Sequence, residues 1–484
     1  MTRKITIDPI TRLEGHGQID IFLDDQGDVE RTYLRVPDFR GFEKFCEGRA
    51  AEEMPRLTQK ICGVCPTAHH LASTKALDAL FGVAPPPAAQ KLRELMYHAF
   101  IFEDHLLHFF FLGGPDFLLE PGIPKEKRNI LGVIDKLGTE LGKKILSIRR
   151  QVREVNARIG GSALYPVWGL PGGVAKSLSE EDRGHIRLVA QEAQAFAESA
   201  LQIFQEAARK NKKFSELLND NLFSHQTYSM GMVDESGRVN FCDGKIRVVD
   251  PRGHEFARFE AADYENYLAE RVESWSYVKL LYLKDIGWHG FTDGPRSGIY
   301  RAGPLARLNA SEGMATSGAQ RRYEEFYEHF GGKPVHNILA YHWARLIECL
   351  YAAEIMTELA ADPEITSPSV RNLPSQLPEE GVGACEAPRG TLFHHYQTNT
   401  EGMMKKVNLL VATQNSAAAI CLSIDKAARA FIHGGNVSEG LLNMIEMAFR
   451  AYDPCLACAT HCLPGEQPTL INLYSKERKL IKIM

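Results

Sequence analysis

Four of the ten cysteines form two Cys-x-x-Cys pairs, one toward each end of the chain. Cys62 and Cys65 stand in Lys-Ile-Cys-Gly-Val-Cys-Pro-Thr-Ala-His, and Cys455 and Cys458 stand in Asp-Pro-Cys-Leu-Ala-Cys-Ala-Thr-His. This spacing lets both sulfurs of a pair face one ion when the chain turns into a helix, and a helix N-terminus favours the thiolate that binds metal. The pairs therefore predict metal or redox chemistry.

The spacing alone leaves more than one kind of site open. A compact structural zinc site has about 12 to 20 residues between its pairs, whereas Cys65 and Cys455 are 455 − 65 = 390 residues apart. A local zinc knuckle is excluded, but a zinc site closed by distant segments and two unrelated pairs remain open. The cysteines outside the pairs, such as Cys242 and Cys349, are interpreted as small buried apolar residues.

The composition narrows the function classes. The chain has 484 residues, 44% hydrophobic and 24% charged, which is typical of a globular protein with a large core. The net charge of −5 and the pI near 6.4 argue against nucleic-acid binding. The N-terminus lacks a secretory pattern, and no apolar run reaches the length of a membrane span. We expect a soluble, cytoplasmic protein without a transmembrane segment, in which the cysteines serve metal or redox chemistry rather than disulfides.

Hydrophobic periodicity predicts the elements that must position the cysteines. The fold class expected is mainly α with peripheral antiparallel β-hairpins (α+β). We predict a single domain over 1–461, with an N-terminal β segment at about 1–37, a helical core and a C-terminal metal segment, followed by a tail at 462–484. The predicted helices cover 91–112, 134–157, 180–210, 261–273, 335–359 and two within 416–451, with a β-rich patch at 228–259 and strands and loops at 380–415.

With their flanking residues, these segments resemble the large subunit of nickel–iron hydrogenases over nearly the whole chain. The motifs that carry the resemblance, in the family's order, are Asp8–Gly17, Phe39–Glu43, the Cys62/Cys65 segment, Glu386–Leu392 and Asp453–His461. The amino-acid sequences of Phe39–Phe45 and Glu386–Tyr396 are most similar to those of the cytoplasmic bidirectional, NAD-linked group. One departure is Lys60, where the family usually has arginine, so bidentate pairing at that position is in doubt.

The resemblance implies a nickel–iron centre held by four thiolates. Cys62 and Cys455 would be terminal nickel ligands, while Cys65 and Cys458 would bridge nickel to an iron that carries one carbon monoxide and two cyanides. Soft sulfur donors suit a redox-active late metal. The activity implied is the reversible heterolytic cleavage of H2 to protons and electrons.

The resemblance also assigns residues around that centre. Arg389 would lie over the open metal face, held by Asp104 and Asp453; taken alone, this arginine is a surface ion pair. Pro388 and Thr413 are expected beside the cofactor, Thr413 being near a segment that lines the cyanide pocket.

Proton transfer and a second metal complete the implied site. Cys455 is the expected proton acceptor and Glu14 the outward relay, since a carboxylate in a dry site exchanges protons near neutrality when its pKa is raised. The alternative for Glu14 is a cap or salt bridge. His69 is expected to hydrogen-bond near the thiolates, and a satisfied core histidine is nearly as good an interpretation. Glu43 and His461 match ligands of a Mg²⁺ ion, which prefers oxygen ligands.

Partners follow from what the sequence lacks. No iron–sulfur motif remains once the paired cysteines are assigned, and no Gly-rich phosphate loop is present. Iron–sulfur clusters and flavin or NAD sites are therefore expected only in partners, which the resemblance implies to be an iron–sulfur small subunit and diaphorase-type subunits. The resemblance also implies a maturation endopeptidase that would cut at His461–Cys462 after nickel-insertion chaperones have acted, and would remove 484 − 461 = 23 residues.

Three alternative functions are distinguished by testable features. A metal-free scaffold subunit like that of respiratory complex I, which binds quinone, would lack the cysteines. A hydrogen-sensing regulatory homologue would in general lack the tail. A zinc-stabilised interaction protein would contain zinc.

Overall fold

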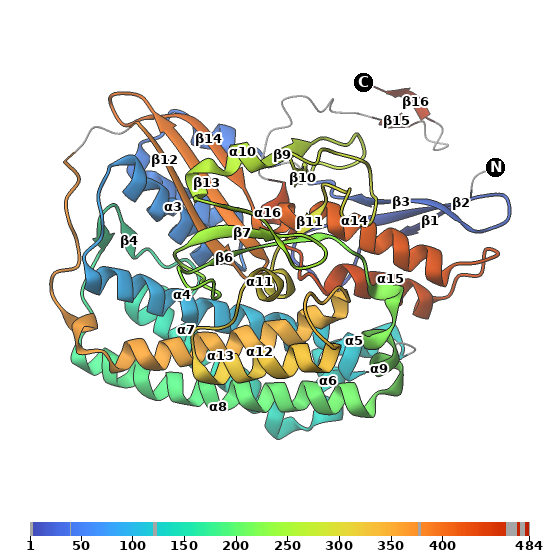
Figure 1. Cartoon of the computed structure of the whole chain (residues 1–484), viewed down its shortest axis with the longest axis horizontal. Helices are drawn as coiled ribbons and strands as arrows, with labels where there is room; N and C mark the ends of the chain where they lie inside the picture. Colours follow the sequence, from blue (N-terminus) through green and yellow to red (C-terminus); the bar gives the residue numbers. More distant parts are fainter. Residues whose placement is uncertain are drawn as a thin grey trace.

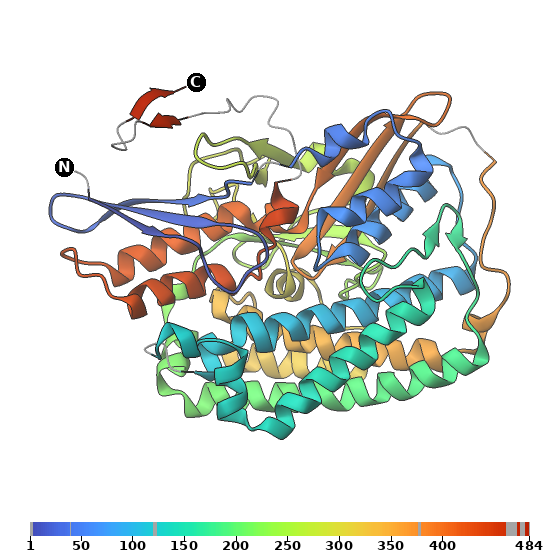
Figure 2. The ribbon, with the colours of Figure 1, turned by 180° about the vertical axis from the view of Figure 1, so that it is seen from behind.

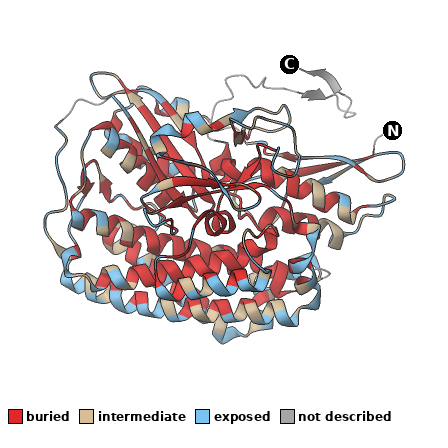
Figure 3. Cartoon of the chain, in the orientation of Figure 1, coloured by how far each residue is buried: buried red, intermediate tan, exposed pale blue. Residues whose placement is uncertain are grey.

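The computed structural model describes residues 3–38, 40–119, 123–375, 379–460, 472–474 and 480–483. Its base is a layer of long helices, seen in the lower half of Figure 1. The members of this layer are α4 (Pro87–Leu107), α6 (Ile130–Leu137), α7 (Thr139–Gly160), α8 (Glu180–Lys210), α12 (Ser317–Phe330) and α13 (Tyr341–Ala361). Nearly every residue of α13 is buried, whereas α8 buries one stripe and exposes the other, as Figure 3 shows. The helix buried on all sides marks the centre of the core.

A three-stranded antiparallel sheet and one helix lie above that layer. The strands are β12 (Glu380–Ala387), β13 (Gly390–Thr398) and β14 (Met404–Leu410), in this order. Helix α3 (Pro66–Leu80) packs directly on them, and a Cβ at Gly383 would lie 2.2 Å from the nitrogen of Ala76. Glycine at this position therefore permits the close approach of strand and helix.

Two further sheets have three and four strands. The N-terminal sheet has the order β1 (Arg3–Ile7), β2 (Gln18–Leu23), β3 (Val29–Arg35) and is antiparallel, as expected. The second region contains β11 (Tyr300–Arg301), β6 (Tyr228–Val233), β7 (Lys245–Val249) and β8 (Glu255–Phe259), in that order.

Two helices from the last quarter of the chain pack beside the N-terminal sheet. Helices α14 (Ala412–Phe431) and α15 (Glu439–Arg450) lie beside the N-terminal sheet in both Figure 1 and Figure 2. The guanidinium of Arg429 donates to the carbonyl of Val29 at 2.7 Å. This contact brings the segment that follows α15, with the second cysteine pair, to the first part of the chain.

Most of the predicted helices are present, but several begin or end at residues other than those predicted. Helix α8 has the predicted bounds because Ser179 caps its first turn. The helix predicted over 134–157 is instead α6 and α7, separated at Gly138 with φ +95°. The helix predicted to end at residue 112 continues through a π-helical turn, His108–Gly113, into α5 (Gly114–Leu118).

Three predictions of local structure were wrong or displaced. The predicted helix over 261–273 was wrong: α10 (Tyr264–Tyr267) ends after one turn and β9 (Leu268–Arg271) pairs with β10 (Leu280–Leu283). Tyr264 and Leu268 are buried together in a separate apolar cluster, so tertiary packing overrides the local periodicity. Helix α14 begins at Ala412, inside the predicted strand-and-loop region, and the regular part of α13 begins at Tyr341 rather than near 335. The mainly α fold class with small antiparallel sheets is confirmed. Among the described residues, none of the helices is both long and apolar enough to cross a membrane.

Candidate metal centre

The four paired cysteines converge on one buried point. Their sulfurs all lie within 4.8 Å of one another, and each side chain is at most 4% exposed. The two pairs face each other, with 3.3 Å between the sulfurs of Cys62 and Cys455 and 3.3 Å between those of Cys65 and Cys458. Segments 390 residues apart therefore supply one cluster of donors, as the sequence predicts (455 − 65 = 390).

The first pair is positioned by the start of α3. Cys65 is the N-cap of this helix, and the backbone nitrogens of Val64 and Cys65 donate to the sulfur of Cys62 at 3.3 and 3.1 Å. Free amides at a helix start stabilise a thiolate. Gly63, between the two cysteines, is exposed, so this loop reaches the surface of the chain.

The second pair is held by the N-terminal motif. The nitrogen of Leu456 donates to the carbonyl of Glu14 at 2.9 Å, and a Cβ at Gly15 (φ +88°) would lie 2.7 Å from the nitrogen of Ala457. Glycine is required at that position by both the conformation and the close approach. The nitrogen of Cys455 donates to the hydroxyl of Thr413 at 2.9 Å, which places Thr413 directly against this pair.

The pKa values of the cysteines are shifted in opposite directions. Burial opposes ionisation of Cys62, but hydrogen bonds from the facing cysteines lower its pKa well below the usual value. Burial and the neighbouring sulfurs raise the pKa of Cys455 well above its usual value. Each thiolate disfavours ionisation of its neighbours, and a bound cation is what would let all four cysteines ionise. The donor set therefore fits a thiophilic metal, and by its chemistry alone it fits zinc as well as nickel.

Arg389 joins two buried carboxylates beside the sulfurs. Its guanidinium contacts Asp104 at 3.1 and 3.2 Å and Asp453 at 3.0 Å. Burial raises the pKa of Asp104 to about 7, against the opposing effect of Arg389, and the shared arginine keeps the two like charges apart. The Nε atom of Arg389 is buried and has no hydrogen-bond partner among the described residues.

Interactions of the buried Arg307 hold the turn that carries Arg389. The fully buried Arg307 pairs with Glu348 and Glu386 at 2.6 and 2.7 Å and donates to the carbonyl of Pro388 at 3.3 Å. The structure thus places Pro388 in the turn, with its carbonyl directed to Arg307. A small cavity next to the turn is lined by Arg389, His69, Thr413, Cys65, Cys455 and Cys458, among others.

Glu14 and His69 contact different cysteines. The thiol of Cys455 donates to Oε2 of Glu14 at 2.8 Å, and this carboxylate is only partly buried. Burial first, and then the nearby Cys62, raises the pKa of Glu14. His69 lies one turn after Cys65, and its Nε2 is 3.4 Å from the sulfur of Cys458. The half-buried carboxylate therefore links the sulfur cluster to the outer part of the molecule.

The structure describes only part of the predicted magnesium site. Oε1 of Glu43 accepts from the nitrogen of Leu409 at 2.7 Å, and Glu43 lies in α1 (Phe42–Cys46). His461 lies outside the described residues. The nitrogen of Arg40 donates to the carbonyl of Thr460 at 3.1 Å, so the Glu43 segment lies beside the residue that precedes His461.

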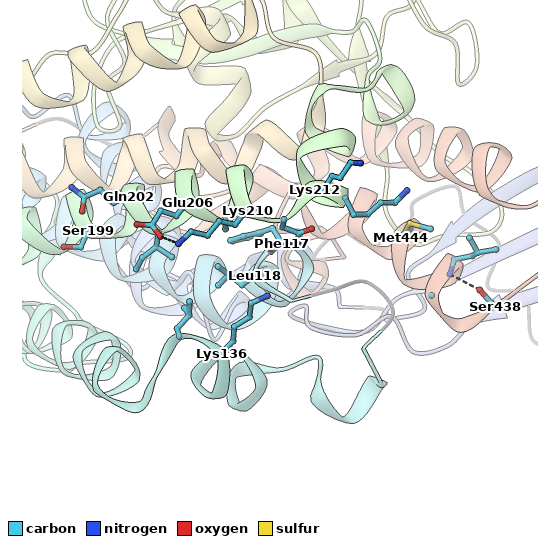
Figure 4. A pocket seen from close by; sticks show the side chains of 17 residues that line it. Phe117, Leu118, Lys136, Ser199, Gln202, Glu206, Lys210, Lys212, Ser438 and Met444 are labelled. Atoms are coloured by element: carbon cyan, nitrogen blue, oxygen red, sulfur yellow. Dashed lines mark hydrogen bonds and ion pairs between the residues drawn. The ribbon is translucent and has the colours of Figure 1, made fainter.

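Another, larger cavity lies away from the sulfur cluster in the described part of the chain. It has a volume of about 1030 Å³ and lies between α5, α6, α8, α9 (Lys212–Asn219) and α15, where Phe117, Lys136, Glu206 and Met444 line it (Figure 4). It contains none of the predicted site residues, so cavity size alone would have pointed away from the sulfur cluster.

Sequence reasoning missed residues that support the centre. The guanidinium of Arg40 donates to the carbonyls of Ile61 at 2.6 Å and Ala457 at 3.2 Å, and so ties the two cysteine segments together. The position of Arg40 in the Phe39–Glu43 motif could have indicated this role from the sequence. His108, which lies 3.9 Å from Asp453, gave no signal because a π-helical turn positions it.

Comparisons with known proteins identify the family. The family described as nickel-dependent hydrogenase matches residues 40–121 and 271–461, and one described as HoxL-like matches residues 4–39. A protein of Archaeoglobus profundus, named as an iron-sulfur subunit of F420-non-reducing hydrogenase, is 45% identical over 99% of both chains. The NAD-reducing hydrogenase HoxS subunit beta of Cupriavidus necator is 35% identical over 99% of both chains.

Two solved hydrogenase structures have the same fold as this chain. A crystal structure of an NAD+-reducing [NiFe]-hydrogenase in the H2-reduced state superposes with a TM-score of 0.89 at 37% identity, over 95% of this chain and 100% of that one. The Ni-Fe-Se hydrogenase of D. vulgaris Hildenborough shares the fold, with a TM-score of 0.74 at 22% identity, over 95% of this chain and 100% of that one.

The buried thiolate cluster on this fold defines a metal-dependent oxidoreductase. The chain belongs to the large, catalytic subunits of the nickel-dependent hydrogenases. The family resemblance inferred from the motifs is thereby confirmed, and the four cysteines form a group that could hold a metal ion in a member of this family.

Proposed function

We propose that this chain cleaves H2 heterolytically and reversibly, and delivers the electrons to an iron–sulfur small subunit. The observation that carries the proposal is the cluster of four buried sulfurs within 4.8 Å, with Arg389 in the wall of the adjoining cavity. When bound, the nickel–iron group supplies the redox-active Lewis acid that polarises H2. The chain supplies the ligands, the charge balance and the proton acceptors.

Cys62 and Cys455 are proposed as terminal nickel ligands, and Cys65 and Cys458 as the bridges to an iron with one carbon monoxide and two cyanides. The convergence of the four sulfurs, all within 4.8 Å of one another, supports a centre shared by these ligands. Thr413, Pro388 and Arg389 are proposed to surround the iron ligands, because all three lie on the turn or the helix start next to the cavity.

Arg389 is proposed to act on H2 from its place beside the cavity. Asp104 and Asp453 hold its guanidinium by separate nitrogen–oxygen contacts, so it stays charged and oriented without filling the cavity. A preorganised cation in a dry site stabilises charge that develops during bond cleavage.

Proton exit is proposed to run from Cys455 to Glu14. The 2.8 Å contact joins the two groups directly. Since burial raises the pKa of Glu14, its carboxylate accepts a proton and releases it outward more readily near neutral pH than an exposed glutamate would. Glu43 and His461 are proposed as Mg²⁺ ligands, supported by the carboxylate chemistry and by the position of Thr460 next to Arg40.

Electron exit is proposed at the Cys62–Cys65 loop. Gly63 is exposed there, and next to it Arg40, Phe42, Phe45, Leu57 and Lys60 line a shallow groove of about 510 Å³. Phe45 is 51% exposed, which is unusual for so large an apolar side chain. An apolar groove with basic residues near the loop that carries Cys62 and Cys65 suits an iron–sulfur partner.

The electron acceptor is proposed to be NAD(P) or a similar soluble carrier, reached through diaphorase-type subunits. The relative named NAD-reducing supports NAD, while the more identical relative named F420-non-reducing supports an acceptor other than F420. We further propose that nickel-insertion chaperones load the site and that an endopeptidase then removes 462–484. An intact tail in the mass spectrum of active enzyme would refute the processing step.

The decisive experiment is elemental analysis with infrared spectroscopy on the complex purified from its own host. We expect nickel and iron together, carbon monoxide and cyanide bands, and H2-dependent reduction of an artificial dye. Testing NAD and other carriers as acceptors then identifies the partner reaction. Zinc, or no metal, in protein cut after His461 would refute the proposal.

A further inference from the structure

A ladder of hydrogen bonds leads away from the sulfur cluster between α3 and β13. Nδ1 of His69 lies 3.1 Å from Nε2 of His394, and Nδ1 of His394 lies 2.6 Å from the hydroxyl of Tyr396. That hydroxyl donates to the hydroxyl of Ser73 at 2.8 Å. With the contact of His69 to Cys458, the ladder joins a proposed bridging cysteine to Ser73 through three aromatic side chains.

The ladder follows from matched spacing on the two elements. His69 and Ser73 are four positions apart on a helix, a rise of about 6 Å, and they face the same side. His394 and Tyr396 are two positions apart on a strand, a rise of about 6.7 Å, and they also share a face. The close packing of α3 on this sheet, visible in Figure 1, brings these two rows into register.

Burial makes the ladder rigid. His69 is 1% exposed, and Ser73, His394 and Tyr396 are not exposed at all. Removal of one member leaves its neighbour with an unsatisfied buried polar group, which costs about 1–3 kcal/mol. The ring of His69 therefore has one favourable orientation, with Nε2 against Cys458.

The ladder also links the tautomers of its members. A neutral imidazole donates from one ring nitrogen and accepts at the other, and a hydroxyl hydrogen rotates to suit its partners. A thiolate at Cys458 can only accept, so Nε2 of His69 must then carry the hydrogen. Nδ1 of His69 in turn accepts from His394, and His394 accepts from the hydroxyl of Tyr396. In this structure that hydroxyl donates to Ser73, so it must turn to His394 when Cys458 is a thiolate.

We propose that His394 and Tyr396 are positioning residues that hold the orientation of His69 and, through rotation of the Tyr396 hydroxyl, select its tautomer, and thereby direct a hydrogen bond to the sulfur of Cys458. The inference rests on the proposed function, since it assigns Cys458 to the metal centre. A hydrogen bond to a metal-bound sulfur withdraws electron density from the metal. The two residues thus influence the iron without contacting it.

The test compares three variants of the complex purified with its partners. Tyr396→Phe removes one oxygen, and His394→Gln removes the central ring. His395→Gln is the matched control, because His395 is the next residue of the same strand and lies on its other face, where it contacts Tyr264 and Glu380. All are compared with the unmodified complex for nickel and iron content and for the infrared bands of carbon monoxide and cyanide.

We expect shifted bands in Tyr396→Phe with the nickel content retained, and a further shift in His394→Gln with nickel affinity or activity lower by about 10- to 100-fold. The bands of His395→Gln should coincide with those of the unmodified complex. Unshifted bands in Tyr396→Phe at full nickel content would overturn the inference, even if His394→Gln fails to fold. Absence of nickel and of the bands from the unmodified complex would instead refute the proposed function.

Discussion

Replacement of Gly113 by alanine tests whether the π-helical turn positions the segment before Cys455. Gly113 has ordinary right-handed angles, φ −81° and ψ −35°, so alanine meets no backbone strain there. Its Cβ would, however, lie 2.7 Å from Cε1 of His342 and 2.8 Å from Cε1 of His108. These two rings stack with 5.6 Å between centroids, and the Nε2 of His108 contacts the carbonyl of Arg450 at 2.9 Å.

The expected loss follows from two opposing effects. Alanine gains about 1 kcal/mol over glycine in a helix, whereas overpacking a dense core costs about 1–3 kcal/mol. Gly184 in α8 is the matched control, because a Cβ there meets nothing within 4 Å. The Gly184→Ala variant should be more stable than the unmodified chain, and Gly113→Ala should be less stable than Gly184→Ala by about 1–3 kcal/mol.

The assay is denaturant unfolding of the metal-free chain, with the midpoint and slope compared between the two variants. In the loaded complex, Gly113→Ala should also lower H2-dependent activity, because displacement of His108 moves the Arg450–Asp453 segment that orients Arg389. Equal stability of the two variants would refute the steric argument. Lower stability with unchanged activity would refute the link to Arg389.

Three further substitutions test separate parts of the structure. Glu14→Gln keeps an acceptor for the Ala457 nitrogen but removes the titratable group, so dye reduction by H2 should fall by about 10²-fold or more at unchanged metal content; an unchanged rate would remove Glu14 from the proton path. Burial raises the pKa of Glu94 to about 7, so the folded chain holds this proton longer than the unfolded chain, and the free energy of unfolding falls as the pH rises from about 4.5 to about 7. Glu94→Gln removes this dependence and should stabilise the chain by about 1–3 kcal/mol above pH 7 and by little near pH 4, and a pH-independent difference would contradict the assignment. Arg40→Met removes the Nη1 atom that donates to the carbonyls of both Ile61 and Ala457, and should weaken the link between the two cysteine segments by about 1–3 kcal/mol, which faster nickel loss to a chelator would show.

The sequence predicted those features that depend on local pattern or on a motif. The repeat of apolar residues and the Ser179 cap determine α8, and the flanking motifs predicted which cysteines would meet. The contact of Arg389 with Asp104 and Asp453 also agrees with the resemblance.

The remainder depends on three-dimensional packing. The strand β9 replaces a predicted helix because Leu268 is buried against residues far away in sequence. The ladder through His394 and Tyr396 depends on how α3 lies across the sheet, and nothing in the spacing of the strand residues alone indicates it. The break at Gly138 was visible as a glycine, but its left-handed conformation is set by the packing of the two flanking helices.

The separation of the two cysteine pairs along the chain has a consequence for biosynthesis. Cys65 leaves the ribosome 390 residues before Cys455 (455 − 65 = 390), which at about 5–20 residues per second is a delay of roughly 20–80 seconds. The half-site of Cys62 and Cys65 therefore exists in the cell before its counterpart has been translated. Any soft metal ion bound early by that pair alone would have only two of the four sulfurs. Selection of the correct metal therefore depends on when the metal binds, because all four sulfurs are available only after the final segment has been translated.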